Sequence, residues 1–271
     1  MIHILKTEMF RLKKSGLFWA MLGVVATMPL VSVLLNVLLF NFVSLDASNM
    51  SVQYDVWELM RTSNITIETL SALPSLTGDS LFALICTSVF LSKEFGGGTF
   101  RNMLLANRSR RDVYISFLLI AVTIGAAYLG ASFVSTLLFN ALVFGFGTIG
   151  AAKVVTACVL SLTLGLISVI FLQSMMCMFM FGTRKLAVAL ACPLVFCIFA
   201  PAMLYSFVET FAQFGIVTEA DMSWVPLYNL NMLDFTAIDG ALIGKILLYL
   251  VPLTALFISL GWITFRKADL K

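Results

Sequence analysis

Residues 93–119 read KEFGGGTFRNMLLANRSRRDVYISFLL, a charged segment between two long apolar runs. Segments that cross a lipid bilayer are almost free of charge, so an insert of this kind marks a place where the chain leaves the membrane. Its three successive glycines, Gly96–Gly98, permit positive φ values and let the chain turn abruptly after the first run. The segment therefore predicts a docking element at a membrane face.

A short helix is predicted within this segment, over residues 100–107, with Thr99 as its N-terminal cap. Apolar side chains share one face at i, i+3 and i+4 spacing, and two arginines flank them. The apolar residues are Phe100, Met103 and Leu104, and the arginines are Arg101 and Arg108. Ser109 and Asp112 then fit a capping box that starts the next helix rigidly. Such a short helix is suited to pass a rigid-body push into the membrane; the alternative is a positively charged anchor without a partner.

The composition is that of a polytopic membrane protein, because 61% of the 271 residues are hydrophobic, 11% are charged and the mean hydropathy is +1.02. Several nearly charge-free runs reach the roughly 20 residues that a helix needs to cross a bilayer. Runs of this length are helices and not barrel strands. We predict an all-α integral membrane fold, a single transmembrane domain over residues 1–271. Its six spans are expected at about 17–40, 73–92, 114–147, 154–181, 186–208 and 246–265.

The run at 114–147 is ambiguous, because one helix of this length would extend about 51 Å, well beyond the hydrocarbon core. Positive charge decides between one helix and two short ones, since Lys and Arg are enriched on the cytoplasmic side. With six spans and both termini inside, all but three of the 17 Lys and Arg are cytoplasmic. The three exceptions are Arg61, Lys153 and Lys245. Splitting the run would place Arg184, Lys185 and the basic C-terminus outside, so one helix is favoured.

The first 16 residues predict an amphipathic helix lying on the inner leaflet, here called the elbow helix (1–16). Apolar residues recur at helical spacing beside a basic face. They are Ile2, Leu5, Met9 and Leu12, and the basic residues are Lys6, Lys13 and Lys14. A simple topology signal is the alternative. The run that follows is too long for the roughly 7 to 15 residues of a signal-peptide core, so it is expected to remain as the first span.

The charged segment, taken as residues 93–113, resembles the cytoplasmic coupling loop of ABC-2 type permeases. The likeness lies in the order and spacing of matched residues: Glu94, Gly98, Thr99, Arg101, Asn102, Leu104, Leu105, Ser109 and Arg110. A looser likeness covers the whole chain, from the six spans to the ending at residues 265–269. Asn107 stands where many members have proline or glycine, and Phe117 where a lysine often occurs.

This resemblance implies that the loop contacts a separate ATPase. The residues expected to couple to it are Glu94, Gly98, Thr99, Phe100, Arg101, Met103, Leu104, Leu105, Arg108 and Arg110. The sequence contains no G-x-x-x-x-G-K-[ST] phosphate loop, so ATP and Mg²⁺ are expected on that partner and no cofactor on this chain. The implied assembly joins two ABC ATP-binding subunits to two permeases, the second being another copy or a paralogue. The implied location is a bacterial plasma membrane, with both termini cytoplasmic.

Three residues are candidates for a substrate pathway. Asp79 lies near the outer end of the second span, where an acid faces a cavity or water, or else lies at the interface. Pro193 and Pro201 can bend the fifth span, although prolines are common in membrane helices. The outer segments are 41–72 and 209–245. The second resembles the re-entrant helices with which ABC-2 permeases close their outer mouth.

Catalysis by this chain is not expected. The single histidine, His3, lies outside the bilayer core, which argues against metal or Ser-His chemistry inside the membrane. The sequence has no G-x-S-x-G elbow. The five cysteines all lie in apolar runs and are interpreted as packing residues, not as metal ligands or disulfides. No catalytic residue and no metal ligand is therefore predicted.

The expected function is that of the membrane subunit of an ATP-driven ABC-2 exporter. The length of the chain and its loop, with the sequence GTFRN at residues 98–102, resemble permeases of lantibiotic immunity, bacitracin resistance and phenol-soluble modulin export, which implies a hydrophobic or amphipathic peptide as cargo. Small lipophilic drugs or lipid-linked glycans are the alternative cargo. A membrane immunity or receptor protein acting by sequestration is the alternative outside transport. Membrane lipid is an expected partner and nucleic acid is not.

Overall fold

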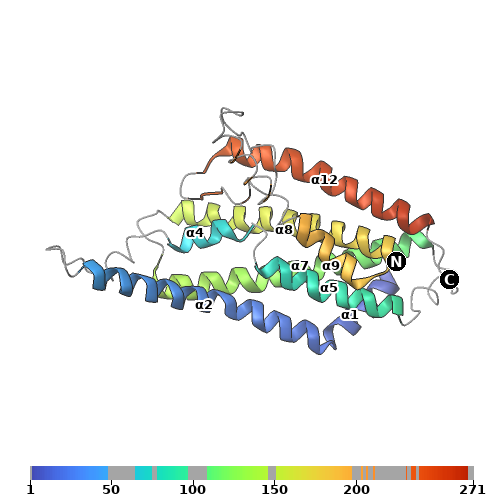
Figure 1. The fold of residues 1–271 in the computed structure, drawn as a ribbon, viewed down its shortest axis with the longest axis horizontal. Helices are drawn as coiled ribbons and strands as arrows, with labels where there is room; N and C mark the ends of the chain where they lie inside the picture. The colour runs from blue at the N-terminus through green and yellow to red at the C-terminus, as the bar shows by residue number, and fades with distance from the viewer. Residues whose placement is uncertain are drawn as a thin grey trace.

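The computed structural model describes residues 2–47, 65–74, 78–96, 109–145, 151–196 and 238–267, with isolated positions between 203 and 235. In this part of the chain every regular element is a helix (Figure 1). The helices are α1 (Ile2–Lys13), α2 (Gly16–Ala47), α4 (Ile65–Ala72), α5 (Gly78–Gly96), α7 (Arg110–Val143), α8 (Ala151–Thr183), α9 (Leu186–Leu194) and α12 (Gly240–Lys267).

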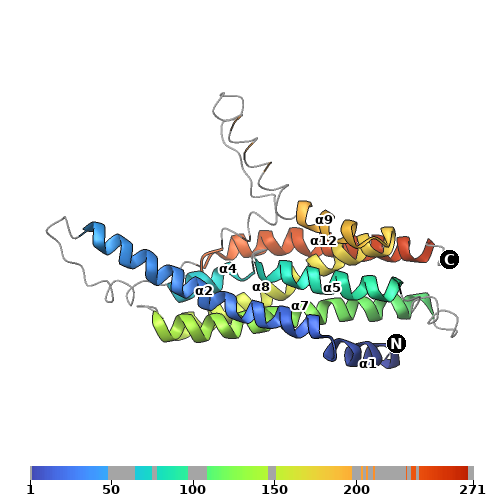
Figure 2. The ribbon, with the colours of Figure 1, turned by 60° about the horizontal axis from the view of Figure 1, so that its bottom comes forward.

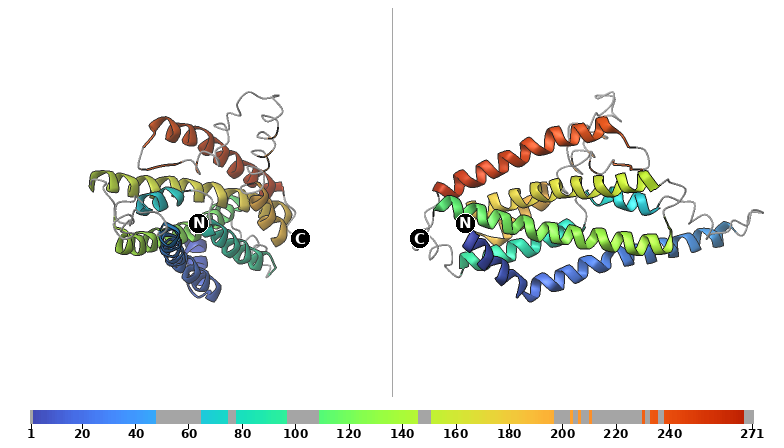
Figure 3. Two further views of the ribbon diagram at one scale, coloured as in Figure 1. Left: turned by 60° about the vertical axis from the view of Figure 1, so that its left-hand side comes forward. Right: turned by 180° about the vertical axis from the view of Figure 1, so that it is seen from behind.

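The long helices lie along one common axis and form an elongated bundle (Figures 1 and 2). The pair α7 and α8 occupies its centre: α7 packs against α2 and α5, while α8 packs against α12, α9 and α5. Both views in Figure 3 show α2 and α12 on opposite sides of this pair. Because α2 and α12 are apolar and contact the bundle along one side only, much of their surface remains for lipid or another chain.

Four of the described helices are long and apolar enough to cross a membrane, over Gly16–Leu39, Arg110–Val143, Ala152–Thr183 and Gly240–Lys267. The predicted second and fifth spans correspond to α5 and α9. Helix α5 has 19 residues and carries charges at both ends, and the continuation of α9 beyond residue 196 lies outside the described residues. Six spans therefore stay a prediction; the chain is a multi-pass membrane protein, and its described elements are all helices.

Helix α7 runs without interruption for 34 residues, so the ambiguous apolar run is one helix. It begins where the Ser109 hydroxyl accepts a hydrogen bond from the backbone N–H of Asp112, at 3.1 Å. It ends at the buried Phe144, after which Gly145 turns the chain with φ +68°. The helix starts four residues before the apolar run because Ser109 can satisfy backbone donors that a lipid-buried terminus could not.

Opposite ends of the bundle differ in charge. One end, here called the basic end, combines α1, the N-terminus of α7 and the C-termini of α5, α8 and α12 (Figure 1). It carries Lys6, Arg11, Lys13, Lys14, Lys93, Arg110, Arg111, Arg184, Lys185, Arg266 and Lys267. The described basic residues near the opposite end are Lys153 and Lys245. Such asymmetry is typical of a basic end that faces the cytoplasm.

Helix α4 packs into the end away from this charge. The Thr66 hydroxyl donates to the carbonyl of Gly145, and the Ser161 hydroxyl donates to the carbonyl of Leu70 at 2.9 Å. Ile67 and Leu70 are fully buried. Part of the predicted outer segment is thus a helix held between α7 and α8, because side-chain hydroxyls satisfy carbonyls at helix ends that would otherwise stay unpaired.

Close contact between α7 and α8 depends on two glycines. A Cβ atom on Gly125 would lie 2.5 Å from Cγ1 of Val169, and one on Gly165 would lie 2.9 Å from Cδ1 of Leu129. Small residues let membrane helices approach closely enough for dispersion contacts to hold them, since water is absent there to drive association. The central helix pair therefore has little room for added volume.

We predict that Gly125→Ala lowers the free energy of unfolding by about 1 to 3 kcal/mol, because the β-branched Val169 cannot easily move away from the added methyl group. Gly130→Ala is the matched control on the same helix, since nothing lies within 4 Å of its added Cβ. Thermal unfolding in detergent compares the two variants. Equal midpoints for both would contradict close packing at Gly125.

Candidate functional site

The predicted coupling residues fall at the basic end, where the structure describes both boundaries of the loop that joins α5 to α7 (Figure 2). Glu94 lies in the last turn of α5, and Arg110 is the first residue of α7. The other eight predicted coupling residues lie outside the described residues: Gly98, Thr99, Phe100, Arg101, Met103, Leu104, Leu105 and Arg108. Within the described residues, the site consists of the contacts that fix each end of the loop.

The first boundary is held by an ion-paired cluster between α1 and α5. Nη1 of Arg11 donates to Oε2 of Glu94 at 2.7 Å and to Oε1 of Glu8 at 3.1 Å. Both carboxylates are almost completely buried, at 0% exposed for Glu8 and 1% for Glu94, while the Arg11 side chain is 44% exposed. Charge-assisted hydrogen bonds of this length are among the stronger polar contacts in proteins. They join α1 to the end of α5, immediately before the loop.

Two buried acids share this one guanidinium, and this arrangement affects the pKa of Glu8. Burial raises the pKa of Glu8, and repulsion from Glu94 raises it further, while Arg11 acts in the opposite direction. A carboxyl group whose pKa is raised by folding stabilises the fold at low pH, and that contribution is lost as the pH rises through the raised value. Ionised Glu8 therefore weakens the cluster that Glu94 and Arg11 hold together.

The second boundary is held by hydrogen bonds from α7 to the backbone of α12. Nη1 of Arg110 donates to the carbonyl of Arg266 at 2.6 Å, and the Tyr114 hydroxyl donates to the carbonyl of Ile258 at 2.8 Å. Gly261 makes room for the tyrosine, since a Cβ there would lie 2.6 Å from its hydroxyl oxygen. A cation over the last carbonyls of a helix is also favoured by the helix dipole. Helix α7 is thus attached to α12 within two turns of the loop.

Aromatic rings join the two boundaries to each other. Phe181, at the end of α8, has its ring centroid 5.7 Å from Phe95, 5.3 Å from Tyr114 and 5.0 Å from Phe265. These partners belong to α5, α7 and α12. Edge-to-face and tilted ring pairs at such distances add attraction beyond the buried area. Phe181 therefore links the four helices that surround the loop.

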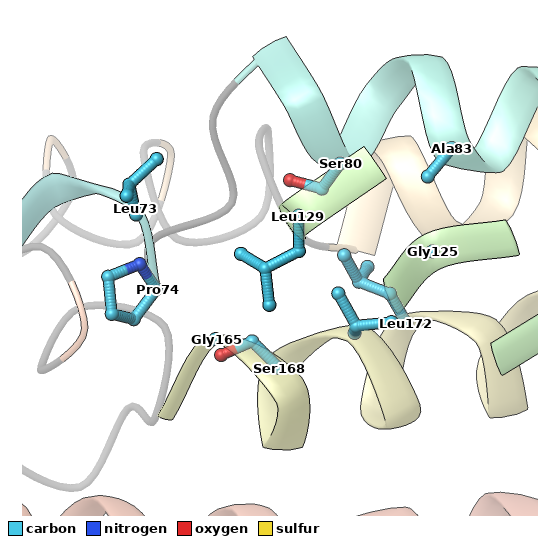
Figure 4. A pocket seen from close by; sticks show the side chains of 10 residues that line it. Leu73, Pro74, Ser80, Ala83, Gly125, Leu129, Gly165, Ser168 and Leu172 are labelled. Carbon is cyan, nitrogen blue, oxygen red and sulfur yellow. The ribbon is translucent and has the colours of Figure 1, made fainter. Parts of the chain in front are cut away.

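The candidate pathway residues are not brought together with this cluster. Asp79 lies in the first turn of α5, with a side chain outside the described residues, and Pro201 is also outside them. Pro193 is buried in α9. A cavity between α5, α7 and α8 is lined by Ser80, Gly125, Leu129 and Ser168 among others (Figure 4). Its volume of about 20 Å³ holds roughly one water molecule, so this part of the bundle is closed to a larger substrate.

The Arg11 and Phe181 contacts could not be found from sequence spacing. Arg11 and Glu94 are 83 positions apart, and any of several basic residues of α1 could have paired with the acid. Helical spacing does place Glu8 and Leu12 on one face of α1, and both are buried. A lone acid among apolar residues on a predicted helix face was the available signal that a basic partner lies opposite.

Replacing Glu94 with Gln is expected to lower the free energy of unfolding by about 1 to 2 kcal/mol, since a charge-assisted hydrogen bond is lost while the exposure of Arg11 limits its strength. Glu8→Gln is the matched control. It removes the repelling charge, so at pH 7 it should leave stability unchanged or raise it. The benefit should shrink as the pH falls, because Glu8 then becomes protonated in the unaltered chain. Thermal unfolding across pH tests both, and a greater loss in Glu8→Gln would contradict the assignment.

A family model described as "ABC-2 family transporter protein" matches residues 4–200, about three quarters of the chain. No curated protein and no solved structure matches significantly. Members of this family are membrane permeases that act with an ABC ATP-binding subunit. Since the match covers most of α1, both helices that bound the loop and the loop itself, the chain belongs to the ABC-2 transporter family and is a membrane permease of an ABC transporter.

Proposed function

We propose that this permease is an exporter subunit in which the loop of residues 97–108 docks on the ATPase and transmits its movement. The observation that carries the proposal is the attachment of the two loop boundaries to different partners. Arg11 joins the end of α5 to α1, and Arg110 with Tyr114 joins the start of α7 to α12. A displacement of the loop would therefore act on four helices, and not on two.

Helix α7 suits the role of a lever. Its 34 residues form one helix of about 51 Å, and the capped start at Ser109 leaves little slack between the loop and the helix. Its buried face contacts α2, α5 and α8 along most of its length. Closely packed interfaces move between discrete arrangements and do not deform continuously, so a push at one end reaches the other. When ATP closes the dimer of partner ATPase subunits, the substrate pathway of the permease would in this way change between inward and outward exposure.

The assembly expected for this mechanism contains two ATP-binding subunits and a second permease, either another copy of this chain or a paralogue. The narrow cavity in the middle of the bundle supports this arrangement, because a substrate route then lies between permeases and not within one. The exposed apolar faces of α2 and α12 provide surface for such contact. Asp79, Pro193 and Pro201 remain proposed pathway residues, and the basic end is proposed to be cytoplasmic.

For cargo we propose a hydrophobic or amphipathic peptide of the toxin or antimicrobial type, which the likeness of the loop to peptide exporters supports. Small lipophilic drugs and lipid-linked glycans form the second candidate class. A protein that only sequesters a ligand would have no need for two anchored boundaries around a loop, so the geometry favours transport over sequestration.

Combined replacement of Arg101 and Leu104 with Glu is expected to reduce transport by about tenfold or more, within the range of typical coupling energies, while the partner ATPase still hydrolyses ATP. The substitutions place negative charge on the predicted docking face and leave the described helices intact. Lys153→Glu, at the opposite end, is the control. Transport and hydrolysis are measured together in vesicles that contain both subunits. Normal transport by the double variant would disprove the docking role.

The cargo proposal is tested by titrating the same reconstituted complex with an amphipathic helical peptide and, separately, with a lipophilic cation. Hydrolysis stimulated by the peptide alone is the expected result, because a bound substrate favours the conformation of the complex that hydrolyses ATP. Stimulation by the cation alone would contradict peptide cargo and indicate that lipophilic drugs are the cargo.

A further inference from the structure

We propose that the cavity between the α1–α2 turn and α5 binds the headgroup phosphate of an anionic membrane phospholipid. This cavity has a volume of about 210 Å³. Its polar wall includes Arg11, Ser15, Lys93 and Glu94, and its apolar wall includes Val89 and Phe90. One small space thus offers both a charged wall and an apolar wall. The proposal rests on the chain being a membrane permease and does not depend on coupling to an ATPase.

The cavity lies at the depth where phospholipid headgroups are found. The Nε1–H of Trp19, whose ring is exposed, donates to the carbonyl of Lys13 at 2.8 Å. Tryptophan side chains favour the headgroup region, and Lys13 and Lys14 beside it are exposed at the turn between α1 and α2. Ser15, in the same turn, lines the cavity. A lipid lying beside α2 would therefore bring its phosphate to the level of this opening.

The arginine in the wall still has hydrogen-bond donors for a ligand. Its three contacts with Glu8 and Glu94 all use Nη1. Within the described part of the chain, the N–H groups on Nε and Nη2 have no hydrogen bond. Adjacent guanidinium N–H groups match two oxygens of a phosphate, which makes arginine the preferred residue for this group. The half-exposed side chain of Arg11 can thus serve Glu94 and a phosphate at once.

Charge around the cavity favours an anion. Lys93 is exposed and forms no ion pair with another described residue. Glu94 is the acid in the wall, and its Oε2 already accepts from Arg11. Lys13 and Lys14 lie at the adjacent turn. The basic side chains therefore outnumber Glu8 and Glu94, and basic pockets between membrane helices on the cytoplasmic side bind anionic headgroups.

The apolar wall distinguishes a lipid from a soluble anion. Phe90 is buried and Val89 is partly buried, and both belong to the stretch of α5 that continues toward the bilayer core. A free phosphate would gain the charged contacts alone, whereas a phospholipid also covers this apolar surface. A phosphate held here would share Arg11 with Glu94, so lipid binding and the contact between α1 and the loop boundary would depend on the same side chain.

The test is native mass spectrometry of the full chain in detergent, after incubation with equal amounts of phosphatidylglycerol and phosphatidylcholine. Preferential retention of phosphatidylglycerol is expected. Lys93→Ala should lower that retention about fivefold, the effect of one basic residue near a membrane surface. Val89→Trp should lower it as well, because the indole fills the cavity without changing charge. Lys153→Ala, a lysine at the far end, is the control and should bind as the unaltered chain does.

Equal retention of the two lipids, or unchanged retention in Lys93→Ala, would overturn the proposal. Displacement of phosphatidylglycerol by millimolar inorganic phosphate would also overturn it and assign the cavity to a soluble anion. Elution volume and helical circular dichroism establish that each variant is folded. If Val89→Trp misfolds, Lys93→Ala still decides, because its side chain is exposed. None of these measurements involves the ATPase, so their failure is separable from a failure of the coupling proposal.

Discussion

The structure of the basic end depends on one contact. In it, the guanidinium of Arg11 lies between the buried carboxylates of Glu8 and Glu94. Two acids cannot both remain charged in so enclosed a place without a cation, and one cation does not compensate both fully. The arrangement persists because Arg11 is half-exposed and reaches water while its tip reaches the acids. This contact joins α1 to α5, and the apolar side of α1 with the buried Leu12 packs against the bundle, chiefly at α7.

The two boundaries of the loop are held by different kinds of contact. One boundary is electrostatic, with α5 bound to α1, and the other is formed by hydrogen bonds and aromatic packing, with α7 bound to α12. Phe181 joins the two. The last turn of α5 contains Glu94, which pairs with Arg11, and Phe95, which packs on Phe181, and these two contacts hold the helix as far as Gly96.

Membrane permeases must be rigid enough to transmit movement and loose enough to move. In this chain the rigid part is the α7–α8 pair, where Gly125 and Gly165 bring the helices into close contact. The outer helices α2 and α12 touch this pair along one side only, and their remaining apolar surface meets lipid or another subunit. Relative movement is then expected between this pair and its neighbours and not within it, because the contacts at Gly125 and Gly165 leave little room for one helix to slide past the other.

Composition and charge alone determined that the chain is helical and crosses a membrane several times, because lipid requires long charge-free runs whose backbone satisfies itself. Charge also favoured one long helix for α7, since a split run would place Arg184, Lys185 and the basic C-terminus outside, and the structure has one helix there. The residues of the loop carried the resemblance to the ABC-2 family.

Other features required the tertiary structure. Any of several lysines and arginines of α1 could have met Glu94, and the choice of Arg11 depends on how α1 packs against α7. The same holds for Phe181, whose three ring partners come from three separate helices. Hydrophobic spacing specifies which residues are buried, but the identity of their neighbours depends on how the helices pack. That packing is decided by the close contacts at glycines and by polar groups that must find partners inside the membrane.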